Sequence, residues 1–194
     1  MKSTFNVLGV AGSIRKGSYS AQVLKIALEH AKKHGAEVRL LDISKMPLYD
    51  PNAPASAEVK QASEVVSWVD AIILASPDYH GSMSGALKNF LDHFYEEFAG
   101  KLFGYIVASH EKGLTVMDQM RTAVRQCYGW SMPYGVSVNG PQDFSGGEIV
   151  SPRLAKRLRM MARDIVVYGR LLNSQFVRDL GSSEQDTFAA HYRP

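Results

Sequence analysis

Apolar runs of strand length alternate along the chain with stretches whose apolar residues recur at helical spacing. The runs predict strands at residues 5–11, 37–43, 71–76, 102–109 and 134–138. The helical stretches lie between and after them, at residues 18–34, 56–68, 84–98, 114–129 and 152–173. The run at 71–76 is almost wholly apolar, which is typical of a central parallel strand covered on both faces. The pattern therefore predicts a doubly wound α/β domain whose ligand lies at the carboxyl ends of the strands.

The domain organisation is simple. A chain of 194 residues that is 45% hydrophobic can bury a full core, and no repeat, low-complexity tract or linker divides it. We expect residues 1–175 to form one domain and residues 176–194 a C-terminal tail. The segment after Asn173 is polar, so it is either a frayed tail, which we favour, or an arm that docks on a partner subunit.

Composition excludes several classes of partner. The formal charge is 22 − 19 = +3, and the basic residues are spread along the chain, which does not favour nucleic acid. No apolar run approaches the length of a membrane span, and the short N-terminal run has no small-residue cleavage site after it. We therefore expect a soluble, cytoplasmic protein with neither a nucleic-acid nor a membrane partner.

The chain offers no protein-based redox centre or metal site. Cys127 is the single cysteine, which excludes an intramolecular disulfide, a Cys-x-x-Cys centre and a cysteine-held iron–sulfur cluster. His110 and Glu111 lack the second histidine of the zinc-protease motif. Any redox chemistry therefore needs something other than sulfur to carry the electrons, and we expect no metal ligands.

The loop between the first strand and the first helix is a candidate anion site. Ser13, Ser18 and Ser20 supply hydroxyl donors there and Arg15 a guanidinium, beside a helix N-terminus whose free N–H groups favour an anion. The loop matches neither the nucleoside-triphosphate motif nor the dinucleotide glycine motif. A mononucleotide or another small phosphate monoester remains, and ordinary turn and capping roles for the same residues stay open.

A second candidate loop follows the third strand. Pro77 stiffens the strand exit, and glycines at 81 and 85 let the backbone approach a flat ligand. Tyr79 and His80 are placed to flank such a ligand. The alternative is a loop whose serines, 82 or 84, only cap the next helix.

Together, these two loops strongly resemble the NADPH-dependent FMN reductase family of flavodoxin-like proteins. The family pattern has G-S-x-R-x-x-S in the first loop and P-E-Y-N-x-S-x-P-G-x-L-K-N after the third strand. This chain departs from it with Asp78 for Glu, His80 for Asn and Ser84 for Pro. The resemblance covers about residues 5–170 and implies a three-layer sandwich around a five-stranded parallel sheet of order 2-1-3-4-5.

The resemblance also implies a cofactor site. The FMN phosphate would lie at the first loop and the isoalloxazine ring at the second, while a third loop after the fourth strand would close over the other edge of the flavin. The implied FMN-binding residues are Ser13, Arg15, Ser18, Tyr19, Ser20, Pro77, Asp78, Tyr79, His80, Gly81, Ser82, Ser109 and Gly113.

The implied activity is FMN-dependent NAD(P)H oxidation. Hydride would pass from NADPH, or NADH, to bound FMN and then to an acceptor in a ping-pong cycle, with no catalytic side chain. Free flavin, quinones, azo compounds, nitroaromatics and metal oxyanions are candidate acceptors, and the family implies a homodimer or homotetramer. Two alternatives stay open: a non-catalytic electron carrier like flavodoxin, and a flavin-free binding protein that keeps the fold.

Overall fold

The central element is a parallel sheet with strand order β2-β1-β3-β4-β5. The computed structural model describes residues 4–193. Its strands are β1 (Phe5–Ala11), β2 (Ala36–Leu41), β3 (Ala71–Pro77), β4 (Leu102–Ala108), β5 (Trp130–Ser131) and β6 (Val136–Val138). The expected sheet order is therefore confirmed.

The fifth position of the sheet is filled by two short strands instead of one. The start of β4 pairs with β5 and its end pairs with β6. Pro133 lies between the two short strands, and a proline has no N–H to donate to a ladder. The predicted strand at 134–138 is thus shorter than expected, and a second pairing segment precedes it.

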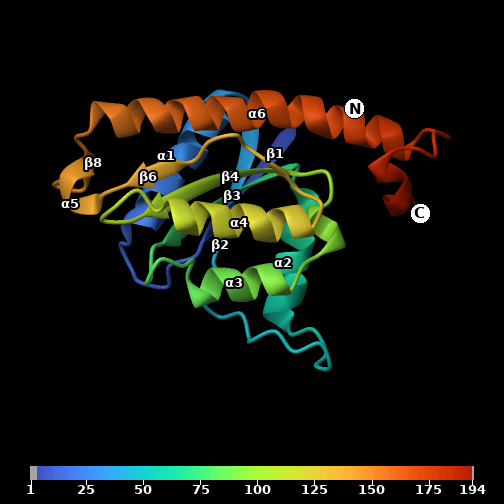
Figure 1. Ribbon diagram of the computed structural model, residues 1–194, viewed down its shortest axis with the longest axis horizontal. Helices are drawn as coiled ribbons and strands as arrows, with labels where there is room; N and C mark the ends of the chain where they lie inside the picture. The colour runs from blue at the N-terminus through green and yellow to red at the C-terminus, as the bar shows by residue number, and fades with distance from the viewer. Residues whose placement is uncertain (1–3, 194) are drawn as a thin grey trace.

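Helices cover both faces of the sheet (Figure 1). One face carries α1 (Tyr19–Lys33) and α6 (Pro152–Leu180), and the other carries α2 (Ala57–Trp68), α3 (Gly85–Asp92) and α4 (Leu114–Gln126). The short elements are the 3-10 turns η1 (Glu96–Phe98) and η2 (Phe188–Tyr192), the helix α5 (Gly140–Asp143), and the hairpin of β7 (Phe144–Ser145) and β8 (Glu148–Ile149). Within residues 4–193, no helix has the length and apolar character that crossing a membrane requires.

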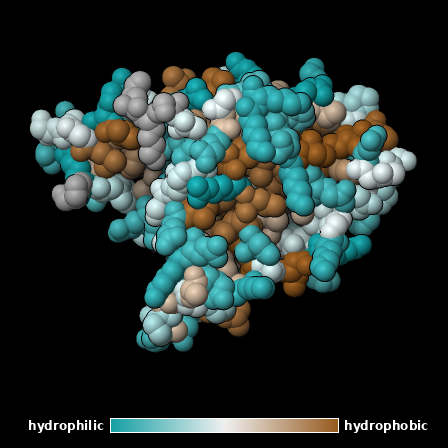
Figure 2. Space-filling model, turned by 180° about the vertical axis from the view of Figure 1, so that it is seen from behind, coloured by the Kyte–Doolittle hydropathy of each residue, from teal (hydrophilic) through white to brown (hydrophobic). Residues whose placement is uncertain are grey.

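Strand alternation divides the core into two halves. In β3, Ile73 packs toward α1 and α6, while Ile72 and Leu74 pack toward α2, α3 and α4, and all three are fully buried. Both faces of the strand are thus covered, as its continuous apolar run predicts. Seen from behind, hydrophilic side chains cover most of the surface around an apolar area near the middle (Figure 2).

The predicted helix at 84–98 ends early. α3 stops at Asp92, and Tyr95 leaves helical geometry at φ −138° before η1 begins. Phe90, Phe94 and Phe98 nevertheless stay in one aromatic cluster, with ring centroids 5.1 Å and 5.7 Å apart for the successive pairs. Their common burial produces the helical spacing in the sequence even though the helix does not continue.

The C-terminal segment differs from the favoured frayed tail. α6 continues to Leu180, past the expected helix end, and the chain then folds back on its own body. Phe188 stacks on Phe176 with centroids 5.3 Å apart, Tyr192 contacts Tyr128, and Ala189 is fully buried. These apolar contacts fix the C-terminal segment to the domain. The sequence did not predict this packing because most residues of the segment are polar.

Candidate functional site

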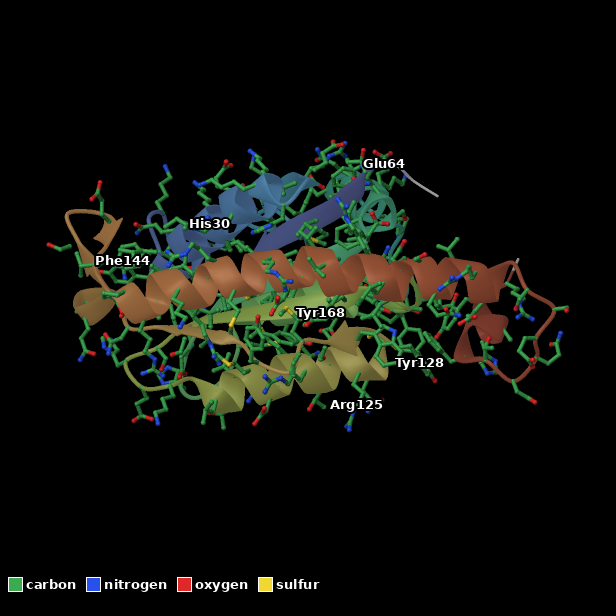
Figure 3. The ribbon with its side chains drawn as sticks, turned by 90° about the horizontal axis from the view of Figure 1, so that it is seen from above. His30, Glu64, Arg125, Tyr128, Phe144 and Tyr168 are labelled. Carbon is green, nitrogen blue, oxygen red and sulfur yellow. The ribbon has the colours of Figure 1, made fainter. Side chains whose placement is uncertain are left out.

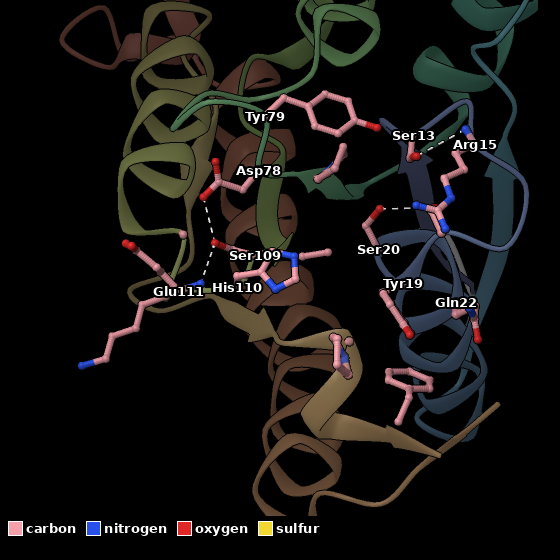
Figure 4. A pocket seen from close by; sticks show the side chains of 18 of the residues that line it. Ser13, Arg15, Tyr19, Ser20, Gln22, Asp78, Tyr79, Ser109, His110 and Glu111 are labelled. Carbon is pink, nitrogen blue, oxygen red and sulfur yellow. Dashed lines mark hydrogen bonds between the residues drawn. The ribbon is translucent and has the colours of Figure 1, made fainter. Parts of the chain in front are cut away.

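A cleft of about 1280 Å³ opens at the carboxyl ends of β1, β3 and β4. The loops after these strands supply most of its lining (Figure 4). Ser13, Arg15 and Ser20 lie on one side of the view, and Asp78 and Ser109 on the other. This is where a doubly wound sheet holds its ligand.

The first loop leads into the N-terminus of α1. Ser18 is the N-cap, with its Oγ accepting from the N–H of Ala21 at 3.4 Å. The hydroxyl of the fully buried Ser20 lies 3.5 Å from that of Ser18. Arg15 is exposed, and its guanidinium makes no ion pair with any residue that the structure describes. The free N–H groups of the helix and the free cation together favour an anion here.

The second loop contains a tight turn. Tyr79 and Ser82 exchange backbone hydrogen bonds of 3.0 and 3.1 Å, and the residues between them, His80 and Gly81, have φ of 58° and 74°. Positive φ at both central positions defines a type I′ turn, which favours Asn-Gly. The family's Asn at position 80 suits this geometry, and the His of this chain enters the left-handed region more readily than most side chains but is not the residue that a type I′ turn prefers.

Asp78 joins the second loop to the third. One carboxylate oxygen accepts from the N–H of Gly81 at 2.9 Å, and the other accepts from the hydroxyl of Ser109 at 2.8 Å. Ser109 Oγ accepts in turn from the N–H of Glu111 at 3.1 Å (Figure 4). A single carboxylate therefore fixes the spacing of two loops that line the cleft.

Ser84 joins the first loop to the second. Its hydroxyl donates to the carbonyl of Gly12 and accepts from the N–H of Leu87, so Ser84 is the N-cap of α3. The residue is only 3% exposed. Where the family pattern has a proline, this chain therefore has a buried hydrogen-bond link between the loops after β1 and β3.

Most of the predicted site residues line the cleft. They are Ser13, Arg15, Ser18, Tyr19, Ser20, Pro77, Asp78, Tyr79, Gly81, Ser109 and Gly113. His80 and Ser82 are not among the lining residues, and the Ser82 hydroxyl donates to Gln119 at 2.9 Å. The flanking role expected for the His80 side chain stays a prediction.

One wall of the cleft, formed by α5 and the β7–β8 hairpin, was not predicted from the sequence. The ring of Tyr19 lies against Phe144, with centroids 5.3 Å apart, and a Cβ on Gly140 would lie 1.9 Å from that ring. Gly146 and Gly147 both have positive φ and form the hairpin turn. The Gly-Gly pair is the sequence signal that predicts such a turn.

The cleft fits a phosphorylated ligand with a flat ring system. An uncompensated guanidinium and a helix N-terminus suit a phosphate, and the volume exceeds the several hundred Å³ of common ligand sites. The turn glycines and Tyr79 border the side where a ring would lie. Across residues 4–193, no three His, Cys, Asp or Glu side chains gather closely enough to hold a metal ion.

Fold and site together define a flavodoxin-like protein with a site for a phosphorylated planar cofactor. The family model of NADPH-dependent FMN reductase matches residues 5–142. An FMN-dependent NADPH-azoreductase of Staphylococcus aureus is 30% identical over 153 residues, which cover 72% of this chain and 79% of the relative. The chain belongs to the NADPH-dependent FMN reductase family, so it is a flavin-dependent oxidoreductase with FMN as cofactor and NADPH as co-substrate.

Solved structures agree with this fold. FerB, a flavoenzyme NAD(P)H:(acceptor) oxidoreductase from Paracoccus denitrificans, superposes with a TM-score of 0.77 at 21% identity, over 87% of this chain and 98% of FerB. The apo form of an NADH:FMN oxidoreductase, EMOB, gives a TM-score of 0.73 at 21% identity, over 85% of this chain and 90% of EMOB. At these identities the likeness concerns the fold.

Proposed function

We propose that FMN binds in the cleft with its phosphate at the N-terminus of α1 and its ring between the loops at 77–82 and 109–113. The free guanidinium of Arg15 beside that helix terminus is the observation that carries this assignment. The backbone of the type I′ turn and of the 109–113 loop would face the ring, and the Tyr19–Phe144 pair would close the side between them.

In this proposal the residues of the chain bind and orient FMN and take no chemical part in the hydride transfer. When bound, FMN supplies hydride transfer from the nicotinamide to a second substrate. Asp78 holds the two ring-facing loops at a fixed spacing, and Ser84 holds the phosphate loop to the ring loop. Such prearranged positions reduce the reorganisation that binding requires.

We propose that the second substrate is a small-molecule electron acceptor and that azo compounds and quinones are the first candidates. The Staphylococcus aureus relative is an azoreductase, which supports azo compounds, and FerB is an oxidoreductase of a general acceptor, which supports a broad choice. Free flavin, nitroaromatics and metal oxyanions complete the set to be assayed.

The test separates an enzyme from the two alternatives. Purified protein is titrated with FMN, and NADPH oxidation is followed at saturating FMN with each acceptor in turn, then repeated with NADH. Binding of FMN with acceptor-dependent NADPH consumption supports the proposal. FMN binding without turnover would indicate an electron carrier, and absence of FMN binding would indicate a flavin-free protein.

We also propose a homodimer or homotetramer that uses α3 and the adjoining side of α4. Tyr95, just after α3, is 53% exposed, which supports an apolar contact there. A light-scattering mass equal to one chain would refute it. A cytoplasmic location stays a prediction from the sequence.

A further inference from the structure

A second concave surface lies far from the flavin cleft. It has a volume of about 600 Å³ and is bordered by α4, by β5 and by Phe188 of the C-terminal segment. Trp130 pairs with Leu102 at the first residue of β4, whereas Ala108 at the other end of β4 borders the cleft. A strand of that length spans about 20 Å, so the two sites are separate.

One wall of this groove is aromatic and held in place. Trp130 contacts Phe188 edge-on with centroids 6.0 Å apart, and Phe188 is stacked on Phe176 of α6. Trp130 is still 46% exposed, and Tyr128 beside it is 52% exposed. Two aromatic side chains are therefore available to a ligand at little further cost in side-chain entropy.

The opposite wall carries one uncompensated positive charge. Arg121 donates to Asp118 at 2.9 Å and lies over the ring of Tyr105 at 5.7 Å. Arg125, about one turn further along α4, is exposed, and its guanidinium makes no hydrogen bond or ion pair with a residue in the described range 4–193. With Asp118 balancing Arg121, the Arg125 guanidinium remains for an anion.

The chain adopts a strained conformation at the rim of the groove. Tyr128 has φ 57°, and the only other non-glycine residue with positive φ in the described chain is His80, at the flavin cleft. This conformation costs about 1–2 kcal/mol for a residue with a side chain. Figure 3 shows Arg125 and Tyr128 at the same end of α4, next to the C-terminal segment.

We propose that this groove binds a small planar aromatic monoanion, such as an aromatic carboxylate, with its ring against Trp130 and Tyr128 and its carboxylate on Arg125. A single free guanidinium favours a monoanion, and the fixed aromatic wall favours a flat ring over an aliphatic chain. One rim of the groove adjoins Tyr95, whose ring lies edge-on to Tyr128 with centroids 6.2 Å apart, so the experiment must also distinguish ligand binding from subunit contact. The proposal does not depend on the identity of the flavin ligands.

The experiment uses the full chain saturated with FMN and benzoate as the probe. Trp68→Phe leaves Trp130 as the sole tryptophan, since the chain has two, and its emission and the heat of binding report occupancy. We expect saturable benzoate binding that Arg125→Ala weakens on the order of tenfold or more, because a charge-assisted hydrogen bond is lost. Arg125→Lys should retain part of the affinity, and Arg153→Ala, an exposed arginine outside the groove, all of it.

Three results would overturn the proposal. Equal benzoate affinity in Arg125→Ala, with an unchanged unfolding midpoint, would remove the anion contact. Benzamide binding as tightly as benzoate would show that charge is not recognised. In the third result, Trp130 emission does not respond to benzoate but changes when light scattering shows that the oligomer dissociates. This outcome would mean that the groove is a subunit contact.

Discussion

The carboxylate of Asp78 accepts a hydrogen bond from the hydroxyl of Ser109 at 2.8 Å, across a separation of 31 residues in sequence. The same carboxylate accepts from the N–H of Gly81 at 2.9 Å. The loops after β3 and β4, which we propose to contact opposite edges of the flavin, thus share one anchor.

Removing that anchor should weaken FMN binding. Asp78→Ala is expected to raise the FMN dissociation constant about tenfold or more, because two hydrogen bonds to a charged group are lost and both loops are released. FMN fluorescence quenching measures the constant. Asp78→Asn keeps the shape and an acceptor for Gly81, so it should recover part of the loss. Equal effects of Ala and Asn would contradict the loop-spacing role.

Arg15→Ala tests the phosphate end of the site. Losing the guanidinium should raise the FMN dissociation constant about tenfold or more while riboflavin, which has no phosphate, is affected little. Because Arg15 is exposed and unpaired within the described residues, the urea midpoint of the FMN-free protein should stay the same. Lys16→Ala, at the adjacent exposed position outside the cleft lining, is the matched control. A parallel loss for FMN and riboflavin would argue against a phosphate contact.

Ser84→Ala should destabilise the fold more than an ordinary cap substitution. The change removes the N-cap of α3 and leaves the Gly12 carbonyl without its hydroxyl donor, which together cost about 2–3 kcal/mol. Urea unfolding of the FMN-free protein measures the difference. Ser56→Ala removes the N-cap of α2 and a hydrogen bond with the exposed Glu58, but no link to another loop, and should cost about 1 kcal/mol. Equal losses in the two variants would mean that the link to Gly12 contributes nothing.

His80→Asn should stabilise the turn at the cleft. Asparagine tolerates the left-handed conformation better than histidine, so the free energy of unfolding should rise by about 0.5 kcal/mol. Chemical denaturation with a fixed m-value detects this change. His34→Asn, at φ −99°, has no such strain to relieve and should not match the gain. A loss of stability in His80→Asn would show that the imidazole itself contributes.

Alkaline pH should destabilise the protein partly through Tyr105. Burial raises the pKa of Tyr105 to about 12, from 10.0 without burial. Between about pH 10 and 12 the unfolded chain releases this proton and the folded chain retains it, so stability is complete below pH 10 and falls as pH rises. The slope is at most about 1.4 kcal/mol per pH unit from this group. Unfolding of Tyr105→Phe across pH 9–11.5 should show a shallower decline, and an unchanged slope would contradict the assignment.

Local pattern predicts much of the fold. The apolar run of β3 forms a central strand because each of its faces meets a helix layer, and burial on both faces requires such a run. The serines and arginine before α1 predict an anion site because a helix N-terminus has the same free N–H groups in any fold. The motif after β3 then placed the chain in a flavin family, which the comparisons confirm.

Tertiary contacts decided the rest. Phe90, Phe94 and Phe98 keep helical spacing across a break because they share one buried cluster, and the pattern registers burial rather than backbone hydrogen bonds. Phe188 docks on Phe176 and Trp130 although the segment around it is polar, since a few aromatic contacts suffice to fix a short segment. The links from Asp78 to Ser109 and from Ser84 to Gly12 join residues 31 and 72 positions apart. The sequence by itself determined the layers and the anion loop, because these follow from local periodicity, whereas the spacing of the loops and the second groove depend on distant residues that only folding brings together.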